Sequence, residues 1–410
     1  MGSDSVRIVH TADFHLGVSF RNITGYNVSE VRREDFKKNI ARIFSEAINR
    51  DADMILISGD VFHRSDPSNR DFVFIANQVG RAAENGIYVI IIAGNHDKPK
   101  TTYAQSPLQG LVEAHAPYFY YFQSIPNGPL IININKESKR AKVAVVPIPY
   151  VDPRIVNEIS EGSISYGKFI NEEISRLIDS IPPDVDYKIL MAHVTVKGAE
   201  LKNIWSVYIN EPTVARSDLI EHFFDYIALG HIHTPQEISK KVVYAGSIER
   251  IDFSELGEEK SFVLAELSED GVSINRAPLE CRPMLSTDTI KIKNALMPDK
   301  ALSDILESLA IPSGSILRII LEADEITWKK LMKGKEILED FLFNKKKILG
   351  YYLKHINPHS PMPENIDTEL RRISLREKII EYIKNLDIDN RVKERALELV
   401  KDILEEARVP

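Results

Sequence analysis

The chain has 410 residues, of which 43% are hydrophobic and 27% are charged, and its formal net charge is −8. This composition is typical of a globular protein with room for two or three domains. No apolar run reaches the roughly 18 residues of a membrane-spanning helix, and the single cysteine excludes an intramolecular disulfide framework. The acidic charge does not exclude nucleic acid, because binding depends on local patches and bound divalent ions add positive charge.

The first 280 residues alternate short apolar runs with helical patterns, which indicates an α/β fold. We predict helices over residues 30–50, where apolar side chains recur at helical spacing, and over 71–86, which ends at a glycine. The short apolar runs predict buried strands at residues 6–12, 54–58, 88–93, 142–148, 187–192, 225–230 and 242–245.

The pattern changes near residue 280, so we divide the chain into a core over 1–280, a small domain over 281–356, a proline-rich linker over 357–367 and a tail over 368–410. A β-α-β-α-β order in the small domain is predicted by segments 289–293, 300–310, 315–323, 326–343 and 346–356. The tail reads as two helices. Its apolar stripe is explained equally by packing on the body of the protein and by docking onto a partner helix; the stripe is Val392, Ala396, Leu399, Val400 and Ile403.

Five of the predicted strands are followed by Asp, Asn or His side chains. In open α/β sheets ligands bind at the carboxyl ends of the strands. One such histidine is more often structural than functional, but five strand ends of this kind in one chain are not a chance arrangement. The candidate ligands are Asp13, His15, Asp60, Asn95, His193, His231 and His233.

Seven ligands exceed what one catalytic ion requires, so they fit two ions that share a carboxylate. Asp60 is the natural bridge, because Gly59 before it allows close backbone approach. The mixed oxygen and nitrogen donors favour manganese, iron or zinc. Two ions about 3.5–4 Å apart suit phosphate ester hydrolysis. His63 and His96 remain as non-ligands that could donate a proton to the leaving oxygen or stabilise the phosphorus.

The motifs "DFHLG", "GDVFH", "GNHD", "AHVTV" and "GHIH" occur in order over residues 6–235 and resemble those of the calcineurin-like metallophosphoesterase superfamily. The finer resemblance is to the SbcD-type nuclease, which acts in double-strand-break repair with an SMC-like ATPase. In "GDVFHRSDP", His63 follows Asp60 by three residues, as in that family, whereas protein phosphatases of the superfamily continue with Asp-Arg-Gly. The segment "AGSIERIDFSE" is similar to the one after the last metal histidines of these nucleases.

The resemblance implies a four-layer α/β/β/α core, a capping domain over 281–356 that helps to admit DNA, and a helical pair over 368–410 that docks on the ATPase. It implies two Mn²⁺ per chain. One would be held by Asp13, His15, Asp60 and His233, and the other by Asp60, Asn95, His193 and His231. His96 would stabilise the transition state, and His63 would orient the substrate or assist the leaving group.

The implied activity is 3′-to-5′ exonuclease on double-stranded DNA and endonuclease on single strands. The resemblance also implies a homodimer through helices near the active site. That face could include Phe72, Ala76, Leu108 and Val112, although packing in the core accounts for them equally well. The lysine clusters over 329–335 and 345–347 are explained equally by phosphate contact and by a solvated helix face.

Two other functions remain open at this point: a phosphodiesterase acting on small nucleotides or other phosphoesters, and a non-enzymatic scaffold with a vestigial metal site. We interpret Asp97 as support for a ligating histidine rather than as a ligand. No signal-peptide pattern is visible, so we expect a cytoplasmic or nucleoid-associated protein. The remaining histidines are expected to be structural or exposed; they are His10, His115, His222, His355 and His359.

Overall fold

The computed structural model describes residues 5–99, 104–136, 139–200, 212–293 and 295–358, and single positions between 393 and 400. The linker from residue 359 onward and nearly all of the predicted helical pair over 368–410 lie outside the described residues. None of the helices within these ranges has the length and apolar character needed to cross a bilayer.

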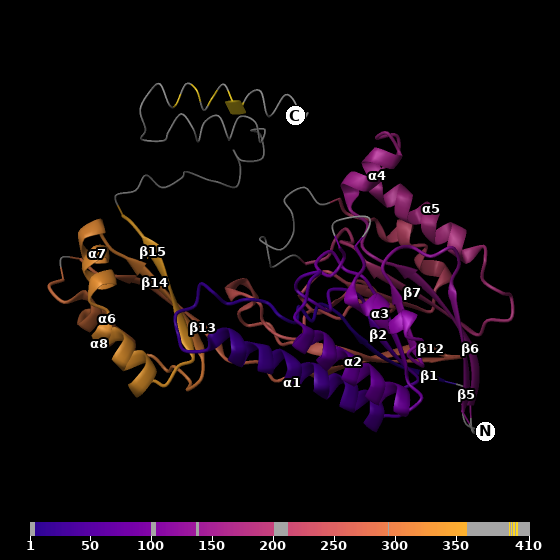
Figure 1. Cartoon of the computed structure of the whole chain (residues 1–410), viewed down its shortest axis with the longest axis horizontal. Helices are drawn as coiled ribbons and strands as arrows, with labels where there is room; N and C mark the ends of the chain where they lie inside the picture. The colour runs from indigo at the N-terminus through magenta and orange to yellow at the C-terminus, as the bar shows by residue number, and fades with distance from the viewer. Residues whose placement is uncertain are drawn as a thin grey trace.

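Two six-stranded sheets form the larger part of the molecule (Figure 1). The first has the order β12 (Gly271–Pro278), β11 (Ser261–Ser268), β1 (Val6–Thr11), β2 (Met54–Ile57), β3 (Tyr88–Ile92) and β4 (Phe119–Phe122). The second has the order β5 (Leu130–Lys136), β6 (Lys139–Ile148), β7 (Tyr187–His193), β8 (Tyr226–Gly230), β10 (Val242–Tyr244) and β9 (Gln236–Glu237). The central strands of both sheets run parallel to their neighbours, whereas β11 and β5 pair in the antiparallel sense.

The two sheets face each other and each carries helices on its outer face. One apolar cluster joins side chains of both sheets, such as Ile8 of β1 and Met191 of β7. A second cluster packs α1 (Val28–Asn49), α2 (Asn69–Glu84) and α3 (Pro107–Glu113) on the first sheet. A third packs α4 (Pro153–Ile159) and α5 (Tyr166–Ile178) on the second sheet. The predicted α/β fold with helix, sheet, sheet and helix layers is therefore confirmed.

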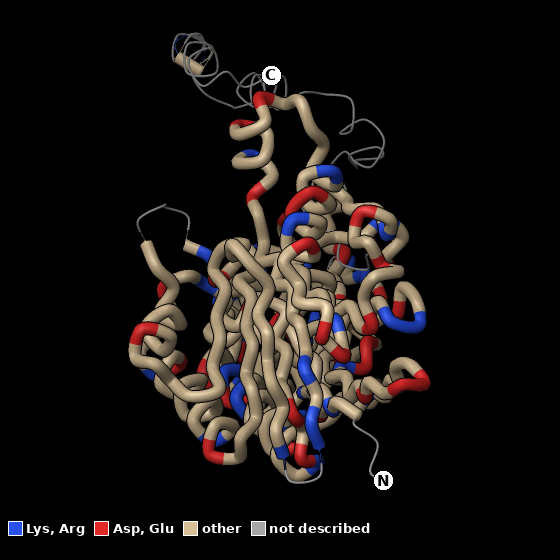
Figure 2. The backbone as a smooth tube through the Cα atoms, turned by 90° about the vertical axis from the view of Figure 1, so that its right-hand side faces the viewer, with Lys and Arg blue, Asp and Glu red and all other residues tan. Residues whose placement is uncertain are grey.

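The apolar pattern of each element explains its place in these layers. Phe36, Ile40 and Ile43 recur at helical spacing along α1 and are fully buried on the first sheet, which stabilises the fold by about 1.5–3 kcal/mol for each side chain. Strands β2 and β3 are buried on both faces and read as continuous apolar runs. Figure 2 shows the result: charged residues gather in helices and loops, whereas the strands are largely uncharged.

A separate parallel sheet lies beyond the core and is called here the three-stranded unit, residues 284–356. It contains β13 (Met284–Lys291), α6 (Pro298–Glu307), β14 (Ile316–Glu322), α7 (Glu325–Lys333), α8 (Glu336–Asp340), the short π-helix η4 (Phe341–Lys345) and β15 (Gly350–Ile356). The prediction of a single helix over 326–343 is wrong, because this segment forms α7, α8 and η4. The chain leaves helical geometry at Gly334, where the absence of a side chain makes the helix easy to end.

The three-stranded unit contacts the N-terminal end of α1 (Figure 1). Thr24 and Tyr351 exchange two backbone hydrogen bonds of 2.8 and 2.9 Å. Arg282, in the segment that leads from β12 into the unit, donates to both carboxylate oxygens of Asp35 on α1 at 2.6 and 2.8 Å. A paired arginine fork of this kind fixes direction as well as distance.

Candidate metal centre

The candidate ligands occupy the loops that follow five parallel strands. Asp13 and His15 follow β1, Asp60 follows β2 and Asn95 follows β3 in the first sheet. In the second sheet His193 is the last residue of β7, and His231 and His233 follow β8. The hydrogen bonds and short contacts described below join all seven residues at one edge of the two sheets.

The backbone is strained where these side chains are presented. Four of the seven candidate ligands are non-glycine residues with positive φ: Asp13 at 51°, His15 at 44°, Asp60 at 54° and His231 at 92°. Such conformations cost of order 1–3 kcal/mol each and cluster at functional sites. Gly59, at φ 98°, gives room to the candidate ligands, because a Cβ there would collide with the His193 ring.

Asp60 lies between two groups of donors. Its Oδ2 atom is 3.6 Å from His15 Nε2 and also 3.6 Å from His193 Nε2. Its other oxygen accepts a hydrogen bond of 2.9 Å from the His96 backbone N–H, which fixes the carboxylate plane. A separation of 3.6 Å is too long for a hydrogen bond, so Oδ2 faces both groups without being satisfied by either.

The first group consists of Asp13, His15 and His233, whose ligand atoms all lie within 4.8 Å of one another. The Nε2 atoms of His15 and His233 are 3.0 Å apart. Two neutral imidazole lone pairs at this distance repel each other unless a proton or a cation lies between them. The carboxylate of Asp13 is held in place by the backbone N–H of His231, at 3.0 and 3.1 Å.

The second group consists of Asn95, His193 and His231. Asn95 Oδ1 is 3.1 Å from His193 Nε2 and 3.2 Å from His231 Nδ1, and these two nitrogen atoms are 3.2 Å apart. His193 is oriented from its outer side, because its Nδ1 lies 2.8 Å from the carbonyl oxygen of Ser58. A carbonyl only accepts, so the proton is on Nδ1 and the Nε2 lone pair faces Asp60 and Asn95.

His233 has the same arrangement with a charged partner. Its Nδ1 lies 2.9 Å from Glu255 Oε1, in the 3-10 turn η3 (Phe253–Glu255). Burial opposes the charge on Glu255, but the hydrogen bond from His233 and the charge of Lys260 hold the pKa of Glu255 at about 2. The carboxylate is therefore ionised and leaves the Nε2 lone pair of His233 facing His15.

The donor set fits divalent cations. Two buried carboxylates, one amide oxygen and four imidazole nitrogens converge, which is a mixed set typical of manganese, iron or zinc sites. Burial raises the pKa of Asp13 to about 7, and the nearby Asp60 charge adds to this rise. Bound cations would supply the positive charge that two adjacent buried carboxylates require.

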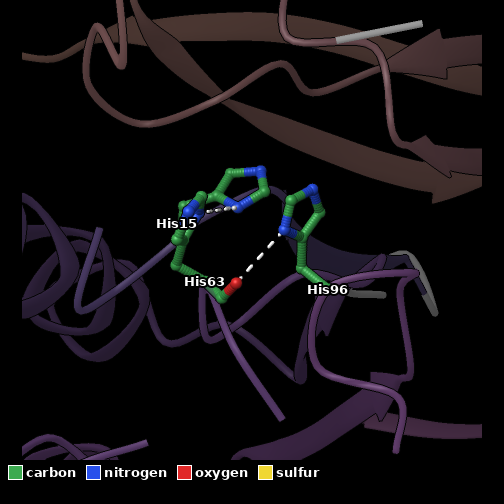
Figure 3. Close-up of side chains that lie close together, drawn as sticks. All are labelled: His15, His63 and His96. Atoms are coloured by element: carbon green, nitrogen blue, oxygen red, sulfur yellow. Dashed lines mark hydrogen bonds between the residues drawn. The ribbon is translucent and has the colours of Figure 1, made fainter. Parts of the chain in front are cut away.

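His63 and His96 lie beside the first group and are half-buried. Their rings are stacked with centroids 5.0 Å apart, and His63 Nδ1 lies 3.4 Å from His15 Nδ1 (Figure 3). His96 Nδ1 is 3.1 Å from the His63 carbonyl oxygen, which accepts a hydrogen bond from the Nδ1–H group. Burial lowers the pKa of His63 to about 4, so this ring is neutral near pH 7.

The sequence matches the calcineurin-like phosphoesterase family over residues 6–235, which is more than half of the 410 residues. The chain belongs to this family. Membership implies hydrolysis of phosphoesters at a two-metal site. Among the described residues, three groups of side chains lie close enough together to hold a metal ion: Asp13, His15 and His233; Asp13, Asp60 and His193; and His15, His63 and His96.

Three solved structures that are similar to this phosphoesterase have 12–13% sequence identity to it. One is GAP50, the anchor in the inner membrane complex of Plasmodium, at 13% identity and TM-score 0.38, covering 67% of this chain and 84% of that chain. Another is a dimetal phosphatase from Danio rerio, at 12% identity and TM-score 0.36, covering 66% and 95%. A cold-active protein-tyrosine phosphatase from Shewanella has 12% identity and TM-score 0.26, covering 68% and 81%.

The structure changes the role assigned to Asp97 and adds a role for Glu255, which was not among the predicted site residues. The view of Asp97 as support for a histidine is wrong: its oxygens accept 2.7 Å hydrogen bonds from the backbone N–H groups of Val61 and Gly94, and so tie the loops after β2 and β3 together. Glu255 was missed as a partner of His233. Its only signal in the sequence is an acidic residue in the segment after the last histidine pair.

Proposed function

We propose that this phosphoesterase is a manganese-dependent DNA nuclease of the SbcD type that hydrolyses phosphodiesters with two Mn²⁺ per chain. The observation that carries the proposal is the position of Asp60, whose Oδ2 faces His15 and His193 at the same distance of 3.6 Å. We assign Asp13, His15, Asp60 and His233 to one ion. We assign Asp60, Asn95, His193 and His231 to the other. Bound there, two such ions lower the pKa of water and neutralise charge on the phosphate.

His63 and His96 are placed to act on the substrate. His96 is fixed at its backbone by Asp60 and at Nδ1 by the His63 carbonyl, so a doubly protonated His96 ring could donate from Nε2 to a phosphate oxygen. The neutral His63 ring would gain a proton when an anionic phosphodiester approaches, and could then pass it to the leaving oxygen. The position of His63 three residues after Asp60 supports a nuclease rather than a protein phosphatase.

The three-stranded unit is proposed as the capping domain that helps to admit DNA. The lysines of this unit differ in whether a carboxylate already pairs with them. Lys329 pairs with Glu325 at 3.3 Å, Lys335 with Glu339 at 3.0 Å, and Lys345 with Glu307 at 2.8 Å, so these three are partly neutralised. In the part of the chain that the structure describes, the exposed Lys330, Lys333 and Lys347 have no ion pair, and we assign phosphate contact to them.

We propose two protein partners: a second copy of the chain and an SMC-like repair ATPase bound by the tail over 368–410. Leu108 is fully buried, and Phe72 and Val112 pack against the apolar cluster between the first sheet and its helices, so core packing accounts for these three. A homodimer through α2 and α3 would therefore use other residues of these helices, such as the exposed Val73.

Degradation of DNA by the purified chain tests the function. Linear duplex and single-stranded DNA are incubated with manganese, with magnesium and with chelator, beside a His63→Ser variant and a control, His222→Ser, which removes an exposed histidine outside the site. We expect degradation in manganese, little in magnesium, and loss of exonuclease activity in His63→Ser alone. Hydrolysis of bis-nitrophenyl phosphate without any action on DNA would favour the small-substrate phosphodiesterase. Inactivity on both substrates would favour the scaffold.

A further inference from the structure

Glu255 is a fully buried carboxylate that has no counterpart among the predicted site residues. It lies at the end of the 3-10 turn η3, and its Oε1 accepts a hydrogen bond from His233 Nδ1 at 2.9 Å. A carboxylate accepts only, so the His233 proton is on Nδ1. The Nε2 atom of His233 then faces the first donor group, 3.0 Å from His15 Nε2.

The carboxylate is itself held rigidly. Its second oxygen, Oε2, pairs with Lys260 Nζ at 2.8 Å and accepts hydrogen bonds from the Ile251 backbone N–H at 3.2 Å and the Ser247 hydroxyl at 3.4 Å. Lys260 is 1% exposed, so its charge is shielded little by solvent. Oε1 is therefore fixed relative to the protein core, and the His233 ring is fixed relative to Oε1.

Lys260 also anchors the histidine segment directly. Its ammonium group donates to the His233 carbonyl oxygen at 3.1 Å and pairs with Glu258 at 2.6 Å. Glu258 in turn accepts a 2.7 Å hydrogen bond from the Thr234 hydroxyl, but its carboxylate has no hydrogen bond to the His233 ring. Two buried acids thus share one lysine, and of these two Glu255 is the one bonded to a candidate ligand.

We infer that Glu255 is the positioning residue for His233, which it orients and makes more basic so that the ion bound by Asp13, His15 and His233 is held tightly. This inference rests on the proposed two-ion centre. A carboxylate behind a ligating histidine commonly changes metal affinity by about 10–100-fold when it is removed. The second ion does not depend on Glu255, because His193 is oriented by the Ser58 carbonyl instead.

Counting bound Mn²⁺ in the full-length chain by equilibrium dialysis tests the assignment without measuring activity. The variants are Glu255→Gln, which keeps an acceptor but removes the charge, and Glu255→Leu, which removes both. Glu258→Gln is the matched control, because it removes a buried acid from the same lysine without changing the bond to His233. We expect Glu255→Leu to weaken one of two ions by about 10–100-fold, Glu255→Gln to weaken the same ion less, and Glu258→Gln to retain both.

Histidine ¹⁵N chemical shifts in the same proteins give a second readout. The His233 ring should carry its proton on Nδ1 in the wild type and in Glu258→Gln, and should populate both tautomers in Glu255→Leu. The inference is overturned if Glu255→Gln and Glu255→Leu bind both ions as tightly as the wild type, or if Glu258→Gln loses the ion equally. A wild-type chain that binds fewer than two ions would instead remove the two-ion centre itself.

Discussion

Phe253 and Glu255 lie on the same three-residue turn, η3, yet they contact different parts of the molecule. Glu255 bonds to His233, whereas the Phe253 ring is stacked on Tyr352 of β15 with centroids 6.3 Å apart. The guanidinium group of Arg318 lies 5.0 Å above the same ring. The turn η3 therefore joins the candidate metal centre to the three-stranded unit. The position of that unit affects the position of Glu255 and, through it, the orientation of the His233 ring.

Replacing Phe253 with alanine should loosen this contact. The aromatic and cation–π terms lost are each about 0.5–1.5 kcal/mol, and they act at the boundary between the core and the three-stranded unit. We expect faster amide hydrogen exchange in β15, with the strands of the core unchanged. Phe343→Ala, which removes a ring packed on Tyr351 inside the unit, is the control for a defect confined to that unit. Unaltered exchange in β15 of the Phe253 variant would show that the contact does not hold the unit.

Asp97 should contribute to the stability of the protein, because it joins the loops after β2 and β3 that carry Asp60 and Asn95. Its two oxygens satisfy two buried backbone amides, and removing the acceptor leaves each amide unpaired at a cost of about 1–3 kcal/mol. We expect Asp97→Ala to lower the free energy of unfolding in urea by about 2–5 kcal/mol. Asp97→Asn, which keeps one acceptor oxygen, should lose roughly half as much. Equal stability of both variants and the wild type would contradict the role assigned to this carboxylate.

His10 predicts a loss of stability in mild acid. Burial lowers its pKa from 6.5 to about 3, with a smaller contribution from the charge of Arg276, and its Nδ1 lies 2.8 Å from the Tyr226 hydroxyl. Below pH 6.5 the unfolded chain binds a proton that the folded chain does not, so stability falls as the pH drops from 6.5 toward 3. At pH 5 this costs about 2 kcal/mol relative to neutral pH.

Urea unfolding at pH 7 and pH 5 checks this sign and size. In a His10→Gln variant the difference between the two pH values should be smaller than in the wild type by about 2 kcal/mol, even though the variant itself is less stable at pH 7. An exposed-histidine variant, His222→Gln, should behave as the wild type does. A pH dependence unchanged by His10→Gln would mean that this ring takes up its proton without cost.

The single donor groups should separate in metal-binding measurements. His233→Ala should lose one of two bound ions and His193→Ala the other, whereas Asp60→Ala should weaken both, because its Oδ2 faces both groups at 3.6 Å. Elemental analysis of bound manganese after dialysis measures this difference. If Asp60→Ala retains one ion at wild-type affinity, the carboxylate does not bridge.

The sequence predicts most of the parallel strands of the core, but it misses the parallel strand β4 and the antiparallel strands β5, β9, β11 and β12. β2 and β3 are continuous apolar runs because both of their faces are buried, and this makes them visible without a structure. β12 alternates exposed and half-buried residues at the sheet edge, so its pattern does not differ from that of a loop. The helix predicted over 326–343 ends early at Gly334, because one glycine interrupts an otherwise uniform helical pattern.

The residues of the candidate site also divide into those that the sequence pattern reveals and those that it does not. Each of the seven candidate ligands could be found because it follows or ends a recognisable strand. Glu255 could not be found in this way, since it lies in a short turn 22 residues after His233 and reaches it only through the folding of η3. The acceptor role of Asp97 was missed for a similar reason: its partners are backbone amides, which the sequence does not distinguish.

Whether two cations share Asp60 is measured by anomalous scattering at the manganese edge, from crystals soaked in Mn²⁺. We expect two peaks about 3.5–4 Å apart, one on each side of Asp60 Oδ2. A single peak, or one held by His15, His63 and His96 away from Asp60, would contradict it.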